Sequence, residues 1–178
     1  LLTLAFEILT SNDLKLSSQI KNELVKTLAN YSGFSGLAGG QYFDLTLENK
    51  KISKRKIIDI QNNKTGKLFA FCCESIGIIK GQSLRKRKEL KDIGLSIGLL
   101  FQIADDLIDF KGDSKIVGKP TKRDKQNGKP NLVNTLGYEK TFIFAKNLRS
   151  KINKKIKKYG NRSKDLLQSV EFILNRKF

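Results

Sequence analysis

The chain has 178 residues and a formal net charge of +18, because 35 lysines and arginines stand against 17 acidic residues. It contains no histidine, which excludes histidine-based triads, histidine metal ligands and histidine general bases. Its two cysteines, Cys72 and Cys73, are adjacent and therefore provide neither a disulfide framework nor the ligand spacing of a zinc site.

Length and cysteine usage favour one domain, residues 1–178, in the reducing environment of the cytoplasm. The apolar start of the chain lacks the basic residues and the cleavage site of a signal peptide. The longest apolar run, residues 93–104, is too short to cross a bilayer. We also expect that further sequence precedes Leu1, since the first helix would begin without a polar cap.

Apolar residues recur at helical spacing along most of the chain, and no segment alternates at period two for long. The pattern predicts an all-α fold without an internal repeat or a second domain. Ser17 or Ser18 is a candidate cap for the second helix and Ser163 for the last, while Gly66 is a tolerated weak point within a long helix. Residues 32–40 lack the spacing of a phosphate-binding loop, and their glycines are expected to let helices approach closely. The expected helices cover residues 1–9, 16–31, 53–79, 83–110, 131–136, 141–159 and 163–174.

Three carboxylates lie at the end of the longest apolar run, in the segment Phe101-Gln102-Ile103-Ala104-Asp105-Asp106-Leu107-Ile108-Asp109-Phe110. At 100° per residue, Gln102 and the three aspartates share an arc of about 100° on an otherwise apolar helix. Buried carboxylates need neutralisation, which basic side chains or a hard divalent cation such as Mg²⁺ can provide. The next segment, residues 111–129, is rich in glycine and lysine and holds both prolines, and this favours a carboxylate–metal–phosphate arrangement over plain ion pairs.

The pattern FQIADDLIDF-x-GD-x₄-GKP-x₃-D-x₃-GK resembles the second aspartate-rich motif and following loop of trans-isoprenyl diphosphate synthases, and is most similar to the bacterial-type farnesyl diphosphate synthases. Two upstream blocks resemble the same family in order and spacing: Gly39-Gly40-Gln41-x-x-Asp44-Leu45 and Lys64-Thr65-Gly66. The resemblance implies an isoprenoid-synthase-type helical bundle. It also implies a prenyltransferase that condenses an allylic diphosphate (dimethylallyl or geranyl) with isopentenyl diphosphate, giving a short-chain product such as farnesyl diphosphate.

The resemblance also implies roles for the charged residues. Asp105 would bind Mg²⁺, with Asp106 and Asp109 supporting it in the metal site; the alternative is a buried ion-pair cluster with the loop lysines. Lysines would contact the diphosphate oxygens as point charges, whereas each lysine alone is more often a solvated surface charge. The implied diphosphate contacts are Lys64, Lys119 and Lys129.

Uncharged residues of the same motifs would stabilise the carbocation that forms as the diphosphate departs. Thr65 and Gln102 are expected to direct oxygen dipoles towards it, although hydrogen bonding to nearby backbone is an equally good account of both. Phe101 would line the hydrocarbon tunnel or be an ordinary core residue. The residues expected to orient the site are Gln41 and Asp44.

The chain departs from the family pattern at Lys122, where glycine is frequent, and at Asn131 and Val133, which stand where the family has Thr-x-Pro. Arg176 and Lys177 resemble a basic tail that closes over diphosphate, and a solvated terminus explains them equally well. The family's first aspartate-rich motif is absent. We therefore expect the C-terminal part of a synthase, truncated at the N-terminus, inactive by itself and a homodimer when complete.

The charge of +18 keeps two other classes of function open. One is a basic helical protein that binds nucleic acid. However, the lysines fill polar positions of amphipathic helices and do not alternate with aromatic residues, so we expect no nucleic-acid partner. The other is a non-catalytic partner subunit of a prenyl synthase. Mg²⁺-dependent diphosphate binding counts against the first alternative, and co-purification with a complete synthase favours the second.

Overall fold

The computed structural model describes residues 1–111 and 130–176, apart from the side chain of Lys111. Every regular element in these two ranges is a helix, which confirms the predicted all-α fold. None of these helices is both long enough and apolar enough to span a membrane. The helices are α1 (Leu2–Thr10), α2 (Ser18–Ser32), α3 (Leu37–Thr46), α4 (Lys54–Gln61), η1 (Asn62–Gly66), α5 (Lys67–Ile79), α6 (Leu84–Lys111), α9 (Leu132–Leu136), α10 (Tyr138–Lys157), η2 (Gly160–Ser163) and α11 (Lys164–Asn175).

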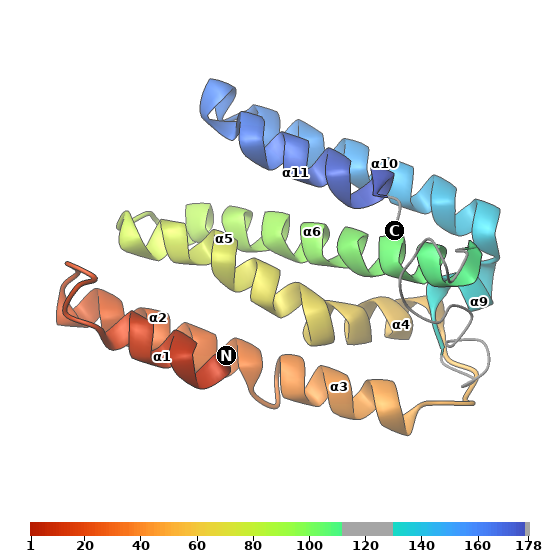
Figure 1. Ribbon diagram of the computed structural model, residues 1–178, viewed down its shortest axis with the longest axis horizontal. Coiled ribbons are helices and arrows are strands. Elements are labelled where there is room, and N and C mark those ends of the chain that lie inside the picture. Colours follow the sequence, from red (N-terminus) through yellow and green to blue (C-terminus); the bar gives the residue numbers. More distant parts are fainter. Residues whose placement is uncertain (112–129, 177–178) are drawn as a thin grey trace.

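The helices form three layers (Figure 1). One outer layer holds α1, α2 and α3, the middle layer holds α4, α5 and α6, and the other outer layer holds α10 and α11. The short helix α9 lies at the end of the bundle where α6 finishes. Among the described helices, α5 and α6 pack along each other more extensively than any other pair. The start of α5 lies beside the second half of α6, where the backbones at Gly66 and Gly98 approach closely.

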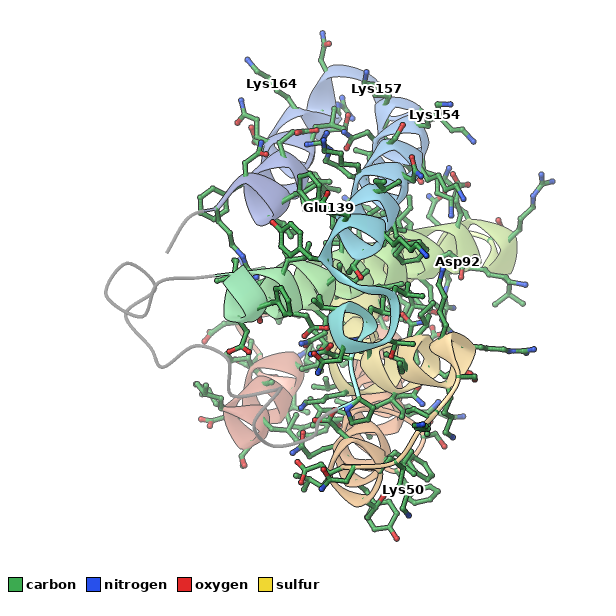
Figure 2. All side chains as sticks on the ribbon, turned by 90° about the vertical axis from the view of Figure 1, so that its right-hand side faces the viewer. Lys50, Asp92, Glu139, Lys154, Lys157 and Lys164 are labelled. Atoms are coloured by element: carbon green, nitrogen blue, oxygen red, sulfur yellow. The ribbon has the colours of Figure 1, made fainter. Side chains whose placement is uncertain are left out.

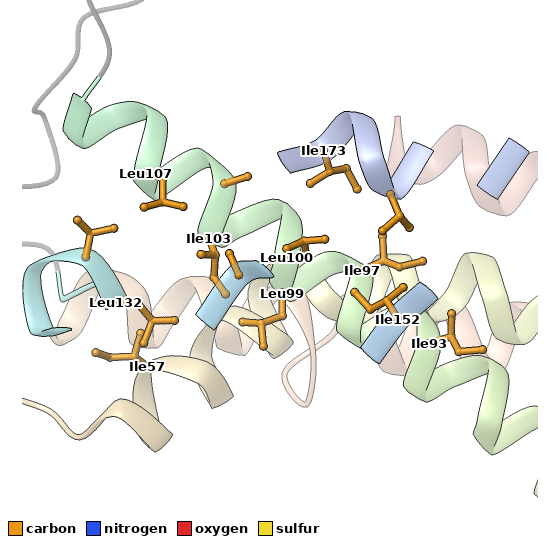
Figure 3. Packing of buried hydrophobic residues seen from close by; sticks show 14 of the residues in the cluster. Ile57, Ile93, Ile97, Leu99, Leu100, Ile103, Leu107, Leu132, Ile152 and Ile173 are labelled. Atoms are coloured by element: carbon orange, nitrogen blue, oxygen red, sulfur yellow. The ribbon is translucent and has the colours of Figure 1, made fainter. Parts of the chain in front are cut away.

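The main hydrophobic core surrounds the second half of α6. Leu100 and Ile103 have no exposed surface, and Figure 3 shows them among side chains from α4, α9, α10 and α11. Burial of large aliphatic side chains on both sides of a helix fixes its rotation about its own axis. The polar edge of α6 is thereby held facing η1 and the end of α11. The buried residues of this core are Ile57, Ile93, Ile97, Leu99, Leu100, Ile103, Ala104, Leu107, Leu132, Val133, Ala145, Ile152, Ile156, Val170 and Ile173.

The long helix predicted over residues 53–79 is interrupted in its middle. Ser53 caps α4 by accepting a hydrogen bond from the Lys56 amide (3.2 Å), as an N-cap residue does. The five residues of η1 then form a π-helical turn before α5 continues. A π turn contains one more residue than an α turn, so it changes which faces the following side chains occupy. The predicted long helix is therefore present from residue 54 to residue 79, and the π turn at the Lys-Thr-Gly block is the part that the pattern did not predict.

Two capping predictions have different outcomes. Ser17 accepts a hydrogen bond from the Ile20 amide (3.4 Å) and caps α2, as predicted. Ser163 stands at the start of α11, but its hydroxyl donates to the carbonyl of Gly160 (2.6 Å) and does not cap the helix. The capping prediction for Ser163 is wrong because a 3₁₀ turn, η2, precedes the helix and its carbonyl takes the hydroxyl.

Basic side chains cover several outer faces of the bundle. Lys154, Lys157 and Lys164 are exposed and project from α10 and α11 into solvent (Figure 2). Lys50 is exposed at the opposite side of the molecule. The positive charge is thus distributed over solvated helix faces, as the amphipathic pattern predicts.

Candidate active site

The π turn η1 lies directly on α3, and a glycine makes this possible. A Cβ atom built on Gly40 would stand 2.3 Å from the backbone nitrogen of Lys64 and 2.7 Å from its Cα, so only glycine fits there. This contact explains Gly40 by close helix approach, as predicted, whereas a Cβ on Gly39 would meet the backbone carbonyl of Phe34 in the preceding turn. It also brings Lys64 next to Asp44 of α3, whose carboxylate lies 2.5 Å from the ammonium nitrogen.

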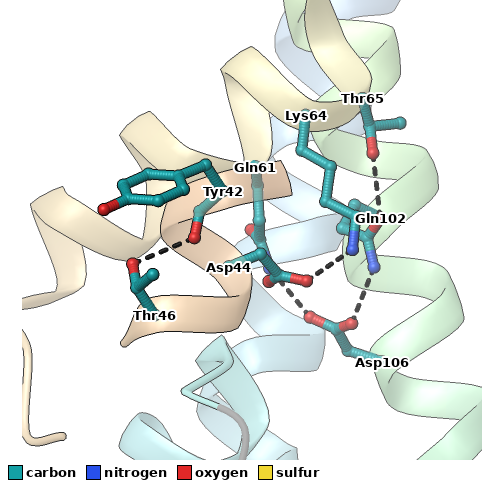
Figure 4. A network of polar contacts seen from close by, with 8 residues as sticks. All are labelled: Tyr42, Asp44, Thr46, Gln61, Lys64, Thr65, Gln102 and Asp106. Atoms are coloured by element: carbon teal, nitrogen blue, oxygen red, sulfur yellow. Dashed lines mark hydrogen bonds and ion pairs between the residues drawn. The ribbon is translucent and has the colours of Figure 1, made fainter. Parts of the chain in front are cut away.

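Asp44 is therefore an ion-pair partner of Lys64, and its predicted orienting role stays a prediction. The Lys64 side chain is 27% exposed and the Asp44 side chain 12% exposed, so both are partly buried. Gln41 lies half-buried on the same helix. It is not among the residues of the polar network that joins η1 to α6 in Figure 4.

A hydrogen-bonded chain connects η1 with α6 (Figure 4). The Thr65 hydroxyl donates to the amide oxygen of Gln102 (3.1 Å), and the Gln102 amide nitrogen donates to Asp106 (3.0 Å). The structure thus brings Thr65 and Gln102 together through their side chains, although they are 37 residues apart. Since the nitrogen end of the Gln102 amide is held by a carboxylate, its oxygen end is held towards Thr65.

Asp106 is the buried anchor of this chain, with 2% of its surface exposed. It accepts a second amide hydrogen bond, from Gln61 at the end of α4 (2.9 Å). Gln61 is itself buried and was not among the predicted site residues. A single glutamine in a helix carries no sequence pattern. The one available signal was its position one turn before Thr65 on a face that is otherwise apolar.

Asp105 occupies the outer part of the acidic edge. Its side chain is 32% exposed, and one carboxylate oxygen lies 2.6 Å from the Arg176 guanidinium. Asp109 is half-buried one turn further along α6. The edge predicted from helical spacing is therefore present, with Asp106 turned inwards and Asp105 accessible.

Arg176, the partner of Asp105, was expected either in a basic tail that closes over diphosphate or in a solvated terminus. The Arg176 side chain is only 6% exposed, which excludes a solvated terminus for this residue. Its guanidinium carbon lies 4.2 Å from the centre of the Phe101 ring. Phe101 also packs against Phe69 at 5.6 Å between ring centres. The predicted diphosphate contacts Lys119 and Lys129, together with Lys122 and Lys177, lie outside the described residues.

The carboxylates of this edge fit the ligand preferences of Mg²⁺. Among residues 1–111 and 130–176, three or more acidic or cysteine side chains do not gather closely enough to hold a metal by themselves. Mg²⁺ is usually held by one or two carboxylates, with water and phosphate oxygens completing six ligands. The accessible carboxylate of Asp105, with Asp109 on the same edge, matches that pattern better than an all-protein site.

A second polar cluster lies at the other end of α5. Glu74 accepts a hydrogen bond from the Tyr31 hydroxyl (2.6 Å), and Arg87 lies 3.7 Å from the same carboxylate group. Arg87 also pairs with Glu23 at 2.6 Å. Burial, followed by the hydrogen bond to Glu74, holds the pKa of the Tyr31 hydroxyl well above its usual range, so this phenol stays neutral.

Solved structures with the same helical arrangement are prenyl synthases. A geranyltransferase from Helicobacter pylori, crystallised with magnesium and isoprenyl diphosphate, superposes with a TM-score of 0.81 at 30% identity. The match covers 97% of this chain and 56% of that one. An FPP/GFPP synthase from Zymomonas mobilis superposes with a TM-score of 0.82 at 34% identity, over 96% of this chain and 57% of that one. The predicted isoprenoid-synthase-type bundle is confirmed.

The chain belongs to the polyprenyl synthetase family, whose model matches residues 1–171. It is 32% identical over 179 aligned positions to the farnesyl diphosphate synthase of Escherichia coli K12, covering 98% of this chain and 60% of that protein. It is 31% identical over 148 positions to the farnesyl diphosphate synthase of Geobacillus stearothermophilus, covering 81% of this chain and 50% of that one. The chain thus spans about half the length of these relatives.

Proposed function

We propose that this chain carries the allylic-diphosphate side of a trans-prenyl synthase site. In the proposed reaction an allylic diphosphate, dimethylallyl or geranyl, condenses with isopentenyl diphosphate, and a short-chain product such as farnesyl diphosphate results. The observation that carries the proposal is the contact between Thr65 and Gln102. It joins the Lys-Thr-Gly block to the aspartate-bearing edge of α6, so that cations, carboxylates and oriented amide dipoles line one site.

Lys64 would bind the diphosphate of the allylic substrate. Its ammonium group is held by Asp44 and remains partly accessible. A lysine offers a point charge with three donors, which suits non-bridging phosphate oxygens. In this proposal the contact with Asp44 holds the ammonium group in position.

Thr65 and Gln102 would face the allylic carbon as the bond to the diphosphate oxygen breaks. The amide oxygen of Gln102 is held in place because its nitrogen is bound to Asp106. A preoriented oxygen dipole stabilises developing positive charge without the reorganisation that water would require. Gln61 supports the same orientation by holding the other oxygen of Asp106.

Asp105, supported by Asp109, would hold Mg²⁺ together with the diphosphate. When bound, Mg²⁺ supplies positive charge that stabilises the departing diphosphate. Lys119 and Lys129 are proposed as further diphosphate contacts, Phe101 as part of the hydrocarbon tunnel, and Gln41 as a supporting residue. Assembly as a homodimer in the cytoplasm is also part of the proposal.

Isothermal titration with geranyl diphosphate tests the assignment. We expect binding by the 178-residue chain in the presence of Mg²⁺ and a large loss of affinity when Mg²⁺ is removed. Because the chain carries a single aspartate-rich edge, we expect no condensation of geranyl and isopentenyl diphosphates by the chain alone. Robust turnover would contradict that second expectation. Salt-sensitive binding of DNA, with no Mg²⁺-dependent binding of the diphosphate, would contradict the first.

A further inference from the structure

Within the described residues, Arg176 makes three contacts with one face of α6. Its guanidinium donates to the carboxylate of Asp105 (2.6 Å) and to the backbone carbonyl of Phe101 (3.3 Å), and it stacks on the Phe101 ring. Phe101 and Asp105 are four residues apart, so they present a ring and a carboxylate on the same side of the helix. A planar guanidinium can satisfy both at once, which an ammonium group cannot.

This arrangement is a built contact rather than a surface ion pair. The Arg176 side chain is 6% exposed, whereas the exposed pair between Arg149 and Glu171 leaves 26% and 43% of those side chains accessible. The buried guanidinium is stacked on the Phe101 ring and has little conformational freedom. Its position at the end of α11 keeps it close to α6. The acidic edge therefore already has one cation from the chain itself.

The Arg176 guanidinium and a metal ion would compete for the carboxylate of Asp105. Mg²⁺ binds carboxylate oxygens at about 2.0–2.1 Å, closer than the hydrogen bond it would replace. A divalent cation on Asp105 would also stand within a few ångströms of the guanidinium charge, where like charges repel strongly. Because the guanidinium bonds only Oδ1 of Asp105, a metal ion bound through that oxygen would have to displace it, and a metal ion bound through the other oxygen would stand beside its positive charge.

We propose that Arg176 is an internal counter-cation of Asp105, which it holds when no metal is bound, and that its charge opposes metal binding at this carboxylate. The inference rests on the proposed function in one respect, namely that Asp105 is a metal ligand. It adds a property of this chain: the C-terminal arginine sets the metal affinity of the acidic edge and maintains the edge when metal is absent.

Mn²⁺ binding to the 178-residue chain, measured by electron paramagnetic resonance without any diphosphate, tests the proposal. We expect Arg176→Gln to tighten Mn²⁺ binding by roughly five- to thirty-fold, the range for loss of one well-formed charged contact. Arg176→Lys should lie between the wild type and the glutamine variant, since it keeps the charge but loses the fork and the stacking. Arg149→Gln is the matched control and should leave the affinity unchanged.

A second readout separates competition from a purely structural role. Without metal, Arg176→Gln should lower the melting temperature, and saturating Mg²⁺ should restore more stability to this variant than to the wild type. Unchanged or weaker Mn²⁺ binding by Arg176→Gln would overturn the proposal. Asp105→Asn should abolish the tight Mn²⁺ site in both backgrounds. If Asp105→Asn binds Mn²⁺ normally, Asp105 is not a metal ligand and the proposed function fails with it.

Discussion

Two buried carboxylates, Glu74 and Asp106, lie at opposite ends of the paired helices α5 and α6 and are satisfied differently. Glu74 belongs to a closed cluster that contains its own cation, Arg87, and a neutral phenol, Tyr31. Asp106 is held by two amides, and the chain of contacts continues through Gln102 to Thr65 on an accessible edge. The first arrangement contains its own cation although it borders a cavity lined by Tyr31 and Glu74, whereas the second leads to the half-buried side chains of Thr65 and Gln102.

The difference shows that a buried acid is not by itself a sign of a functional site. Glu74 joins α2, α5 and α6, and its cluster fastens the outer layer to the middle one. At the other end, Asp106 accepts hydrogen bonds from the amide nitrogens of Gln61 and Gln102, and these contacts orient the two amide groups. Substitutions in the two regions should therefore affect different measurements.

Loss of Lys64 should have the largest effect on ligand binding. Lys64→Ala removes the ammonium group that we assign to the diphosphate, and truncating one partner of a close charge pair commonly costs about 2–5 kcal/mol of binding free energy. We expect geranyl diphosphate affinity, measured by titration calorimetry with Mg²⁺, to fall by roughly a hundredfold. Lys91→Ala, at the Glu74 end of α6 where its ammonium lies over the Tyr31 ring, is the control and should bind normally.

The close contact of η1 with α6 provides the next test. A Cβ on Gly98 would lie 2.6 Å from the Cα of Gly66, backbone against backbone. Gly98→Ala should therefore lower the free energy of unfolding by about 2–3 kcal/mol through overpacking, and displace Thr65 from Gln102.

Gly77→Ala is the matched control for this substitution at the other end of the helix pair. There the nearest atoms are side-chain carbons, the Cγ of Arg87 at 2.9 Å and the Cδ1 of Leu90 at 3.1 Å, so we expect a smaller loss of stability than from the backbone contact at Gly98. Urea unfolding of both variants gives the comparison. Equal destabilisation of the two would mean that the approach of Gly66 and Gly98 is not special.

Glu74→Gln should separate stability from ligand binding. Arg87 keeps its pairing with Glu23, so we expect a loss of about 1–2 kcal/mol in the free energy of unfolding rather than complete unfolding. Mg²⁺-dependent diphosphate binding at 25 °C should stay unchanged in the folded fraction. If Glu74→Gln kept its stability but lost diphosphate binding, the assignment of stability to the Glu74 cluster and of ligand binding to the Asp106 end would be contradicted.

The smallest expected effect is on the reactivity of the Cys73 thiol, which adjoins Glu74 on α5. Burial, with a lesser effect of Cys72, raises the pKa of the Cys73 thiol to about 11. At pH 8 about one Cys73 in a thousand is then a thiolate, so iodoacetamide should modify it slowly in the folded protein. The raised pKa contributes stability below the usual thiol pKa, and this contribution is lost as the pH rises through about 11. Mass spectrometry of the two peptides across pH, with urea-unfolded protein as control, measures it; rapid labelling of Cys73 at pH 8 would contradict close packing here.

Helical periodicity was sufficient for most of the helices and for the acidic edge. It did not predict α3 (Leu37–Thr46), whose Gly-Gly pair interrupts the apolar pattern. The edge of Gln102, Asp105, Asp106 and Asp109 needed only 100° per residue and a buried opposite face. The π turn at residues 62–66 could not be predicted in that way. It differs from an α turn by one residue, and it is stabilised by the contacts of Gly66 and Lys64 with other helices.

Contacts between distant segments were the other missing part. Gln61 lies 45 residues before Asp106, and Arg176 lies 71 residues after Asp105, so no local pattern connects either pair. We expected a metal ion rather than a basic side chain beside the acidic edge. This expectation was incomplete, because Arg176 is hydrogen-bonded to the Asp105 carboxylate. The predicted lysines at 119 and 129 lie outside the described residues, and their roles stay predictions.

The most direct test of the account is calorimetric titration of inorganic pyrophosphate into the 178-residue chain, with and without Mg²⁺, for the wild type, Asp105→Asn and Glu74→Gln. If the α6 edge and η1 form a metal-dependent diphosphate site, the wild type and Glu74→Gln bind with Mg²⁺ at least about tenfold more tightly than without it, and Asp105→Asn loses that difference. Binding of equal strength in all three proteins, with or without Mg²⁺, would contradict the account.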